Sequence, residues 1–254
     1  MELSSKKYWE DNWRDLKLPA KYLKDYSHEI FAKKIKKIFQ KENFRLKNFI
    51  EIGGCPGRWA DFFNTNFGAI CDVIDYEKRG CALTRKNFKF LGIKGEIYNQ
   101  DIFHNSLKKE SYDVVLSSGL IEHFTKLKPI FEKHYELLKK KGILIISVPN
   151  LKTSTFYDFF ATKHKKSYSN YRAVSKNALW QLAKNKKMKI LFCDYLGVIN
   201  LGIVKRTILI NNFFKKIRRI FDYFFSGLDC LIALSHIKKE SATFSPNIFL
   251  IAKK

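Results

Sequence analysis

The sequence has few acidic residues for its length. It contains 24 Asp and Glu against 48 Lys and Arg, which gives a formal net charge of +24. Such an excess favours anionic partners, namely nucleic acid, anionic lipid or phosphorylated substrates. Lys, Ile, Asn and Phe are also abundant, and a genome-wide compositional bias would produce the same charge without a partner. The charge therefore indicates a partner only where it clusters.

Cysteine pairs and long apolar runs are absent as well. The five cysteines are odd in number and form no CxxC pair, so we expect neither a disulfide framework nor a zinc site. This usage favours a reducing, cytoplasmic setting. No run reaches the ~20 apolar residues that span a bilayer, and the nearest, Ile190 to Val204, contains Asp194. Residues 1–13 hold no apolar stretch, so we expect no secretory signal.

Apolar residues make up 46% of the chain, which is enough for a substantial core. Residues 28–41 predict an amphipathic helix, because its Ile and Phe residues share one face and its lysines fill the other. Residues 127–140 predict another helix, with Gly142 as its left-handed C-cap, and Ser175 predicts the N-cap of a helix ending near Lys187. The predicted strands are Asn48–Gly54, Ala69–Ile74, Glu96–Tyr98, Tyr112–Leu116, Ile143–Val148, Lys189–Val198 and Asn247–Ala252.

The alternation of strands and helices predicts βαβ units and a parallel sheet. We expect an α/β Rossmann-like fold, with a seven-stranded, mostly parallel sheet, helices on both faces and a helical insertion before the last strand. The segment before that strand is long for such a connection, which favours the insertion. One domain over residues 1–254 would comprise N-terminal lid helices (1–47), a ligand-binding core (48–198), a basic amphipathic insertion (199–246) and the last strand (247–254).

Glycines and acidic residues follow the predicted strands in a pattern typical of nucleotide binding. Phe49–Gly57 reads F-I-E-I-G-G-C-P-G, a strand followed by a turn whose glycines allow positive φ and close approach of a ligand. Such a turn alone also occurs in dinucleotide-binding proteins. Asp75 ends the second strand, where a ribose-binding carboxylate belongs. Asp101 follows the third strand, and the fourth runs into S-S-G-L-I-E-H-F.

These segments resemble the class I S-adenosylmethionine-dependent methyltransferases, in the branch that acts on small molecules and lipids. That branch includes quinone-pathway O-methyltransferases and enzymes of surface-glycan biosynthesis. The resemblance covers residues 49–198 and the last strand. ELLKKKGILIISVPN matches the family's fifth-strand block, which ends in Pro-Asn as Pro149 and Asn150 do here. YRAVSKNALWQL resembles the next helix, which an Arg precedes, as Arg172 does here.

The resemblance implies a role for each residue of the S-adenosylmethionine site. Glycines shape the loop under the methionine part, Glu51 orients that loop and reaches the amino group, and Asp75 accepts hydrogen bonds from the ribose. The cofactor carries an amine, two ribose hydroxyls and an aromatic amine, all of them donors, so acceptors are expected around it. The remaining positions are Tyr76 against the adenine, Asp101 and the Ile102 N–H at its amino edge, the carbonyls of Ser117 and Ser118 at the methionine ammonium, and Gly53, Gly54 and Gly57 in the loop.

The loop departs from the family pattern at one position. The family has E-x-G-C-G-P-G, whereas this chain has Gly54 and Cys55 in the reverse order. A Cys at the central glycine position narrows the room for the cofactor. The change could weaken binding or mark a degenerate protein, but we expect a modest backbone adjustment, because Gly54 is adjacent.

His123 is the candidate catalytic base. Methyl transfer from a sulfonium depends mainly on proximity and alignment, but an alcohol acceptor benefits from a base near neutral pKa. The alternative is that Glu122 and His123 only cap a helix or support the pocket. In quinone O-methyltransferases a second Glu three residues earlier helps to bind a metal. Gly119 occupies that position here, so we predict no metal.

Two aromatic segments are candidates to cover the site. Tyr8, Trp9 and Trp13 would form a lid over the cofactor or the core of the first helix. The loop after the fifth strand should border the acceptor, because ligands of open α/β sheets bind at the carboxyl ends of strands. Its candidate substrate residues are Tyr171 and Arg172.

The predicted insertion is basic and amphipathic. In residues 208–225, Phe and Ile share one helical face, and Lys215, Lys216, Arg218 and Arg219 lie towards the other. This pattern is typical of helices at membrane surfaces, and also of a helix that packs on a core or forms a dimer. We expect residues 205–239 to contact an anionic membrane surface, which would place the enzyme peripherally at the inner face of the membrane.

The sequence thus predicts a methyltransferase that acts on an oxygen of a small or lipid-linked acceptor, in lipid or surface-glycan biosynthesis. An RNA methyltransferase is the alternative, since C-P-G-R-W is similar to the glycine loop of RNA ribose methyltransferases. Those enzymes use a Lys-Asp-Lys-Glu set, whereas Ser117, Ser118 and Gly119 stand where the Asp belongs. The Pro-Pro-Tyr of base-amino methyltransferases is also absent. A third reading is a non-catalytic cofactor-binding module, which Cys55 makes possible.

Overall fold

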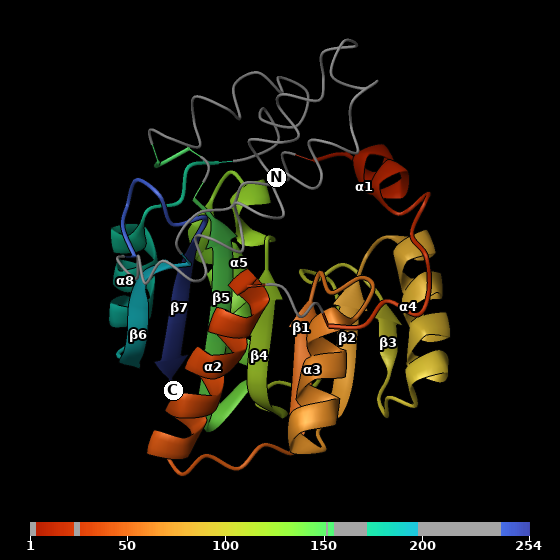
Figure 1. The fold of residues 1–254 in the computed structure, drawn as a ribbon, viewed down its shortest axis with the longest axis horizontal. Helices are drawn as coiled ribbons and strands as arrows, with labels where there is room; N and C mark the ends of the chain where they lie inside the picture. Colours follow the sequence, from red (N-terminus) through yellow and green to blue (C-terminus); the bar gives the residue numbers. More distant parts are fainter. Residues whose placement is uncertain (1–3, 23–25, 151, 155–171, 198–239) are drawn as a thin grey trace.

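The fold is organised around one mixed β-sheet. The computed structural model describes residues 4–22, 26–150, 152–154, 172–197 and 240–254. The sheet has seven strands in the order β3-β2-β1-β4-β5-β7-β6 (Figure 1). Neighbouring strands are parallel from β3 to β5, whereas β7 runs antiparallel to both β5 and β6. The predicted Rossmann-like, mostly parallel α/β fold is confirmed.

Each of the seven predicted strands is present, with β5 beginning earlier than predicted. The strands are β1 (Asn48–Ile52), β2 (Ile70–Asp75), β3 (Ile97–Asn99), β4 (Tyr112–Ser118), β5 (Leu138–Pro149), β6 (Lys189–Leu196) and β7 (Asn247–Lys253). The described helices are α1 (Lys6–Asn12), α2 (Tyr26–Lys41), α3 (Arg58–Phe67), α4 (Lys78–Leu91), the 3-10 turn η1 (Ile121–His123), α5 (Leu127–Leu137) and α8 (Lys176–Asn185).

The predicted end of the helix over residues 127–140 is wrong. α5 ends at Leu137, and Leu138 is both its C-cap and the first residue of β5. Gly142 lies inside β5, and the left-handed conformation falls on Lys141, with a φ of 64°. Leu138 is fully buried and pairs with Tyr112 of β4. Tertiary pairing thus outweighs the helical preference of the lysine run that follows.

Two apolar layers cover the two faces of the sheet. Alternate strand residues point to opposite faces, so Phe49 belongs to one layer and Ile50 to the other. α2, α3 and α4 cover the first face, where the Phe49 and Phe63 rings stack at 4.3 Å between centroids. α5 and α8 cover the second face. Ser175 caps α8 as predicted, because its Oγ accepts the Ala178 N–H at 3.1 Å.

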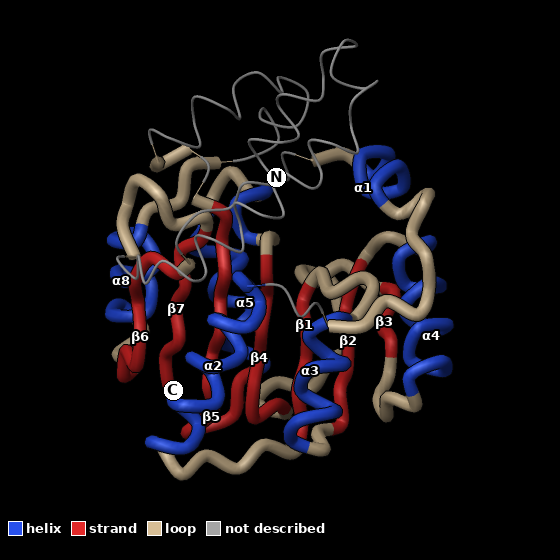
Figure 2. The backbone as a smooth tube through the Cα atoms, in the orientation of Figure 1, coloured by secondary structure: helices blue, strands red, loops and turns tan. Residues whose placement is uncertain are grey.

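The carboxyl ends of the parallel strands meet at one edge of the sheet. This edge lies at the top of Figure 1, on the side where α1 is found. Figure 2 shows the loops that follow β1 and β2 gathered there. Within the described residues, no helix is long and apolar enough to cross a membrane.

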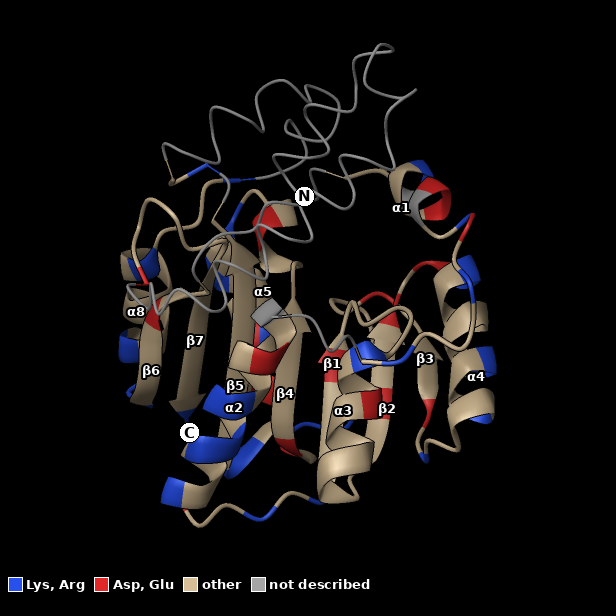
Figure 3. Ribbon diagram, viewed as in Figure 1, with Lys and Arg blue, Asp and Glu red and all other residues tan. Residues whose placement is uncertain are grey.

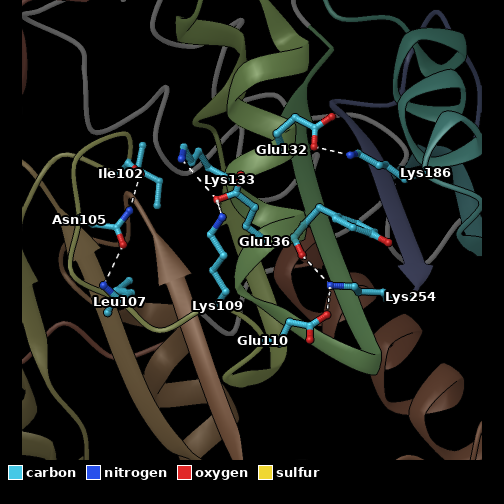
Figure 4. Close-up of polar contacts among 11 residues, drawn as sticks. Ile102, Asn105, Leu107, Lys109, Glu110, Glu132, Lys133, Glu136, Lys186 and Lys254 are labelled. Carbon is cyan, nitrogen blue, oxygen red and sulfur yellow. Dashed lines mark hydrogen bonds and ion pairs between the residues drawn. The ribbon is translucent and has the colours of Figure 1, made fainter.

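Much of the positive charge is distributed among ion pairs and separate helices. Lysines lie along α2, α4 and α8 rather than in one block (Figure 3). Near α5, Glu136 pairs with Lys109 and Lys133 at 3.4 Å each, and Lys254 donates to Glu110 at 2.8 Å (Figure 4). Such ion pairs stabilise the fold only weakly, because water and salt screen them. In this part of the chain, local pairing neutralises some of the basic excess.

Candidate functional site

A pocket opens where the carboxyl ends of β1, β2, β3 and β4 meet. Residues from all four strand ends line it, together with residues of α1 and the start of α3. This is the crevice in which open α/β sheets bind their ligands. Nine of the predicted site residues line the pocket: Glu51, Gly53, Gly54, Asp75, Tyr76, Asp101, Ile102, Ser118 and His123.

The glycine loop after β1 is shaped by two close approaches. Gly53 adopts a φ of 68°, and its N–H donates to the Ile74 carbonyl of β2 at 2.8 Å. A Cβ on Gly54 would lie 2.5 Å from Cγ of Glu51, so the absent side chain makes room for that carboxyl group. Gly57 is the N-cap of α3, with a φ of 85°, and is not among the residues that line the pocket.

Cys55 packs against a glycine of α4. Its Sγ lies 3.3 Å from the Gly80 carbonyl oxygen, and a Cβ on Gly80 would stand only 3.0 Å from that sulfur. The thiol is largely buried, which raises its pKa and keeps it protonated. Gly80 thus provides the space that the reversed Gly54 and Cys55 order requires, and no local sequence pattern indicates this contact.

Glu51 is a buried acid at the floor of the pocket. It is 5% exposed, and its Oε2 has no hydrogen-bond partner among the described residues. Burial and the nearby Asp75 charge raise the pKa of Glu51 to about 8, against a lowering by an Ala60 backbone hydrogen bond and by Arg58. A buried carboxyl group without a partner costs free energy unless a ligand completes it. Glu51 is therefore positioned to accept from a ligand amine.

Two acidic residues follow β2 and β3 as predicted. Asp75 ends β2, and its Oδ1 accepts the Glu77 N–H at 2.9 Å. Asp101 is engaged within its own turn, since Oδ1 accepts the Phe103 N–H at 2.9 Å and Oδ2 lies 3.1 Å from His104 Nδ1. An ionised carboxyl group has about four lone-pair sites. Both residues line the pocket and bring acceptor oxygens to it.

Ile102 is held by the turn that follows β3. Its carbonyl accepts from Asn105 Nδ2 at 2.6 Å, and Asn105 Oδ1 accepts the Leu107 N–H at 2.9 Å (Figure 4). This arrangement fixes the backbone beside the pocket, where an adenine ring is expected.

The two serines at the end of β4 differ. Ser118 lines the pocket, whereas Ser117 is fully buried and its Oγ lies 2.8 Å from His134 Nε2. His134 Nδ1 lies 2.7 Å from the Ile130 carbonyl, to which it must donate, so Nε2 accepts from the Ser117 hydroxyl. Burial lowers the pKa of His134 to about 4, consistent with a neutral ring. The Ser117 side chain thus supports the α5 layer.

His123 lies at the β4 end of the pocket, beneath the N-terminal residues. It is 2% exposed, and its Nδ1 lies 2.5 Å from Ser4 Oγ. The Trp9 ring meets the His123 ring edge-on, with centroids 4.9 Å apart. Trp9 and Trp13 also line the pocket, and their rings stack at 6.3 Å. The N-terminal aromatic residues therefore cover the site next to His123.

Glu122 is a second buried acid. It is 1% exposed, and neither carboxyl oxygen has a hydrogen-bond partner among the described residues. Burial raises its pKa to about 8. It is not among the residues that line the cofactor pocket, but a Cβ on Gly119 would stand 3.6 Å from its Oε1. Only the adjacent His123 received a catalytic role from the sequence, because burial of Glu122 has no local signature.

The predicted substrate residues are placed only in part. Arg172 lies beyond the pocket lining: its N–H donates to the Glu122 carbonyl at 2.7 Å, and its guanidinium donates to the Thr125 carbonyl. It therefore fixes the backbone around η1. Tyr171 and the insertion over 205–239 lie outside the described residues. In the described part of the chain, no group of three or more potential ligands could hold a metal ion.

The pocket fits the chemistry of S-adenosylmethionine. The cofactor's donors require acceptors, and the carboxyl groups of Glu51, Asp75 and Asp101 line three successive strand ends. The unpartnered Oε2 of Glu51 is an acceptor that a ligand amine would satisfy. When bound, the cofactor supplies an electrophilic methyl group on a sulfonium.

The sequence of this region matches a methyltransferase domain. The match covers residues 50–146, from β1 through β5, and contains the glycine loop, both strand-end aspartates and His123. Together with the fold, this match supports an S-adenosylmethionine-dependent methyltransferase. Its cofactor is S-adenosylmethionine.

Solved methyltransferase structures share the fold at low sequence identity. A candidate sarcosine dimethylglycine methyltransferase from Galdieria sulphuraria aligns with a TM-score of 0.66 at 14% identity, over 98% of this chain and 97% of that chain. A SAM-dependent methyltransferase from Archaeoglobus fulgidus aligns with a TM-score of 0.56 at 15% identity, over 91% of this chain and 100% of that chain. Geranyl diphosphate C-methyltransferase from Streptomyces coelicolor A3(2) aligns with a TM-score of 0.57 at 10% identity, over 92% of this chain and 85% of that chain. No protein with a curated description matches the sequence.

Proposed function

We propose that the protein methylates an oxygen atom of a small or lipid-linked acceptor. The observation that carries this proposal is the place of His123. Its ring is buried at the β4 end of the pocket, under Trp9, with Nδ1 next to the Ser4 hydroxyl. A base beside the pocket is useful to an alcohol, whose O–H proton must leave as the new C–O bond forms.

The Ser4 contact decides which ring nitrogen can act. If Nδ1 of His123 donates to Ser4 Oγ, Nε2 carries no proton and can take one from an acceptor hydroxyl. If Ser4 donates instead, Nε2 carries the proton and His123 can only donate there. The proposal requires the first arrangement, in which Ser4 fixes the tautomer and orients the base.

Glu122 supports an acceptor that brings hydrogen-bond donors. Both of its carboxyl oxygens are buried and without a partner among the described residues. A hydroxyl-rich acceptor, such as a glycan or a lipid headgroup, would offer such donors near His123. The Arg172 N–H holds the Glu122 carbonyl at 2.7 Å and so keeps this turn in place.

The lipid-linked part of the proposal rests on the sequence of residues 205–239. That segment combines lysines and arginines with Phe and Ile at helical spacing. Near an anionic leaflet each cation contributes about 1 kcal/mol, screened by salt. We expect wild-type protein to co-float with anionic liposomes, more weakly at high salt, and a Lys215, Lys216, Arg218 and Arg219 to Glu variant to stay behind while still binding cofactor.

The acceptor can be identified by labelling. Purified protein and cofactor with a radiolabelled methyl group are added to a cell extract, which is then divided into lipid, glycan, RNA and protein fractions. We expect label in the lipid or glycan fraction, and the His123→Ala variant is the control for enzyme-dependent label. Label in RNA would instead support the RNA methyltransferase that the net charge of +24 favours.

A further inference from the structure

Arg58 is a pocket residue that none of the roles above uses. It follows Gly57 directly, is the first residue of α3, and lines the pocket. Among the residues that line the pocket, it is the only Lys or Arg, whereas Glu51, Asp75 and Asp101 are all acidic. A single cation placed among three acids calls for a functional explanation, because the pocket is otherwise suited to donors.

The guanidinium of Arg58 has no partner in the part of the chain that the structure describes. Its Nε is buried with no hydrogen-bond partner, and within the described residues the side chain makes no ion pair. An exposed lysine such as Lys189 does find a carboxylate partner in the same structure. An arginine offers five N–H donors in a fork that matches a carboxylate. Arg58 therefore has unused capacity for an anion inside the pocket.

Arg58 and Glu51 lie close enough to interact electrostatically without forming an ion pair. The Arg58 charge is one of the influences that lower the pKa of Glu51, yet Glu51 Oε2 also has no partner. Arg58 thus lacks an acceptor and Glu51 lacks a donor, and both residues line the same pocket. A ligand with an ammonium and a carboxylate on a single carbon would satisfy both.

We propose that Arg58 binds the α-carboxylate of the methionine part of the cofactor, while Glu51 faces its amino group. The start of α3 helps, because Gly57 provides no side-chain cap and the helix N-terminus is electropositive. The inference rests on S-adenosylmethionine as the cofactor, and it assigns to this chain a residue pair that recognises a free amino-acid group.

Two ligands that differ only in the carboxylate test this assignment. Calorimetry on purified full-length protein would compare S-adenosylmethionine with decarboxylated S-adenosylmethionine. For Arg58→Met we expect affinity for S-adenosylmethionine to fall about tenfold to hundredfold, as for the loss of a charged hydrogen bond. Affinity for the decarboxylated ligand should stay within about twofold of wild type, which also shows that the pocket is folded. Arg58→Lys should restore part of the loss.

Arg45→Met is the matched control, since Arg45 is exposed and does not line the pocket. It should leave both affinities unchanged. An equal loss for both ligands in Arg58→Met, or no loss for either, would overturn the assignment of Arg58. If wild-type protein binds neither ligand, the cofactor assignment itself fails, and the two failures are therefore distinguishable.

Discussion

The two buried acids of the site have different surroundings. Glu51 lies in β1, lines the pocket and has the Arg58 charge nearby, whereas Glu122 lies in the turn after β4, outside the pocket lining. Burial raises both pKa values to about 8, but only Glu51 has a basic residue among the causes of its shift. The cofactor always has the same structure, so fixed charges such as those of Glu51 and Arg58 can match it. At the β4 end, Glu122 has no partner among the described residues.

The largest effect is expected at the β4 end, on the chemical step. His123→Ala should lower turnover roughly 10²–10⁴-fold, because it removes the group that takes the acceptor proton. Cofactor affinity, measured by calorimetry, should not change. Ser4→Ala is the companion variant, and it should lower turnover less, because it affects only the tautomer and orientation of the ring. A folded His123→Ala protein with normal turnover would leave His123 a purely structural role.

At the β2 end the effect should fall on binding instead. Asp75→Ala should lower the affinity for S-adenosylhomocysteine, the demethylated product of the cofactor, by a hundredfold or more. The reason is that it removes two charge-assisted hydrogen bonds, which contribute about 1.5–3 kcal/mol each. Turnover at saturating cofactor should fall much less. Calorimetry and initial rates measure the two effects separately. Unchanged affinity would show that Asp75 does not bind the ribose. It would also remove the contrast between a binding effect at the β2 end of the pocket and a turnover effect at the β4 end.

Both buried acids should limit stability as the pH rises, but only Glu51 should also affect cofactor affinity. Because the folded pKa of Glu122 is raised to about 8, its ionisation destabilises the fold as pH rises from about 4.5 to 8. The free energy of unfolding of Glu122→Gln should therefore be about 1–3 kcal/mol higher than that of the wild type at pH 8. This difference should shrink toward pH 4.5. Urea denaturation at several pH values measures it.

Glu51→Gln is the matched variant for this comparison. It should also gain stability toward pH 8, because the pKa of Glu51 is raised in the same direction. Unlike Glu122→Gln, it should lower the affinity for S-adenosylhomocysteine. Equal cofactor affinities in the two variants would contradict the division between a binding acid and an acceptor-side acid.

The smallest effect is expected at Ser117. Ser117→Ala removes the donor to His134 Nε2 and should lower the free energy of unfolding by about 1 kcal/mol. Cofactor affinity should be unchanged, since the Ser117 side chain faces α5. Thermal unfolding and calorimetry test the two statements, and a cofactor defect would show that the Ser117 side chain also helps to shape the cofactor pocket.

Sequence patterns predicted the elements better than the contacts between them. The seven strands follow from apolar runs and their boundaries, and the pocket acids follow from their positions after strands. The C-cap at Gly142 failed because Leu138 pairs with Tyr112, a contact between distant residues. Tertiary pairing of that kind has no local signal.

The same reason explains the missed site residues. Arg58, the contact of Cys55 with Gly80, and the contact of Ser4 with His123 each depend on which segments the fold brings together. One signal was available: Arg58 directly follows the glycine loop, at a helix start that faces a pocket. Burial and missing partners, which distinguish Glu122, can be read only from a structure.

The ends of β6 and β7 are paired across the sheet, Leu196 with Asn247. Pro246 packs against Gly197, whose added Cβ would lie 3.1 Å from Pro246 Cδ, and Asn150 Nδ2 donates to the Ser245 carbonyl at 2.9 Å. Gly197 is thus held beside the segment that leads into β7. In general, a flexible connection between two fixed chain ends costs only about 0.6 kcal/mol more for each doubling of its length. We therefore expect that a variant in which a short turn replaces residues 198–239 would keep the sheet folded.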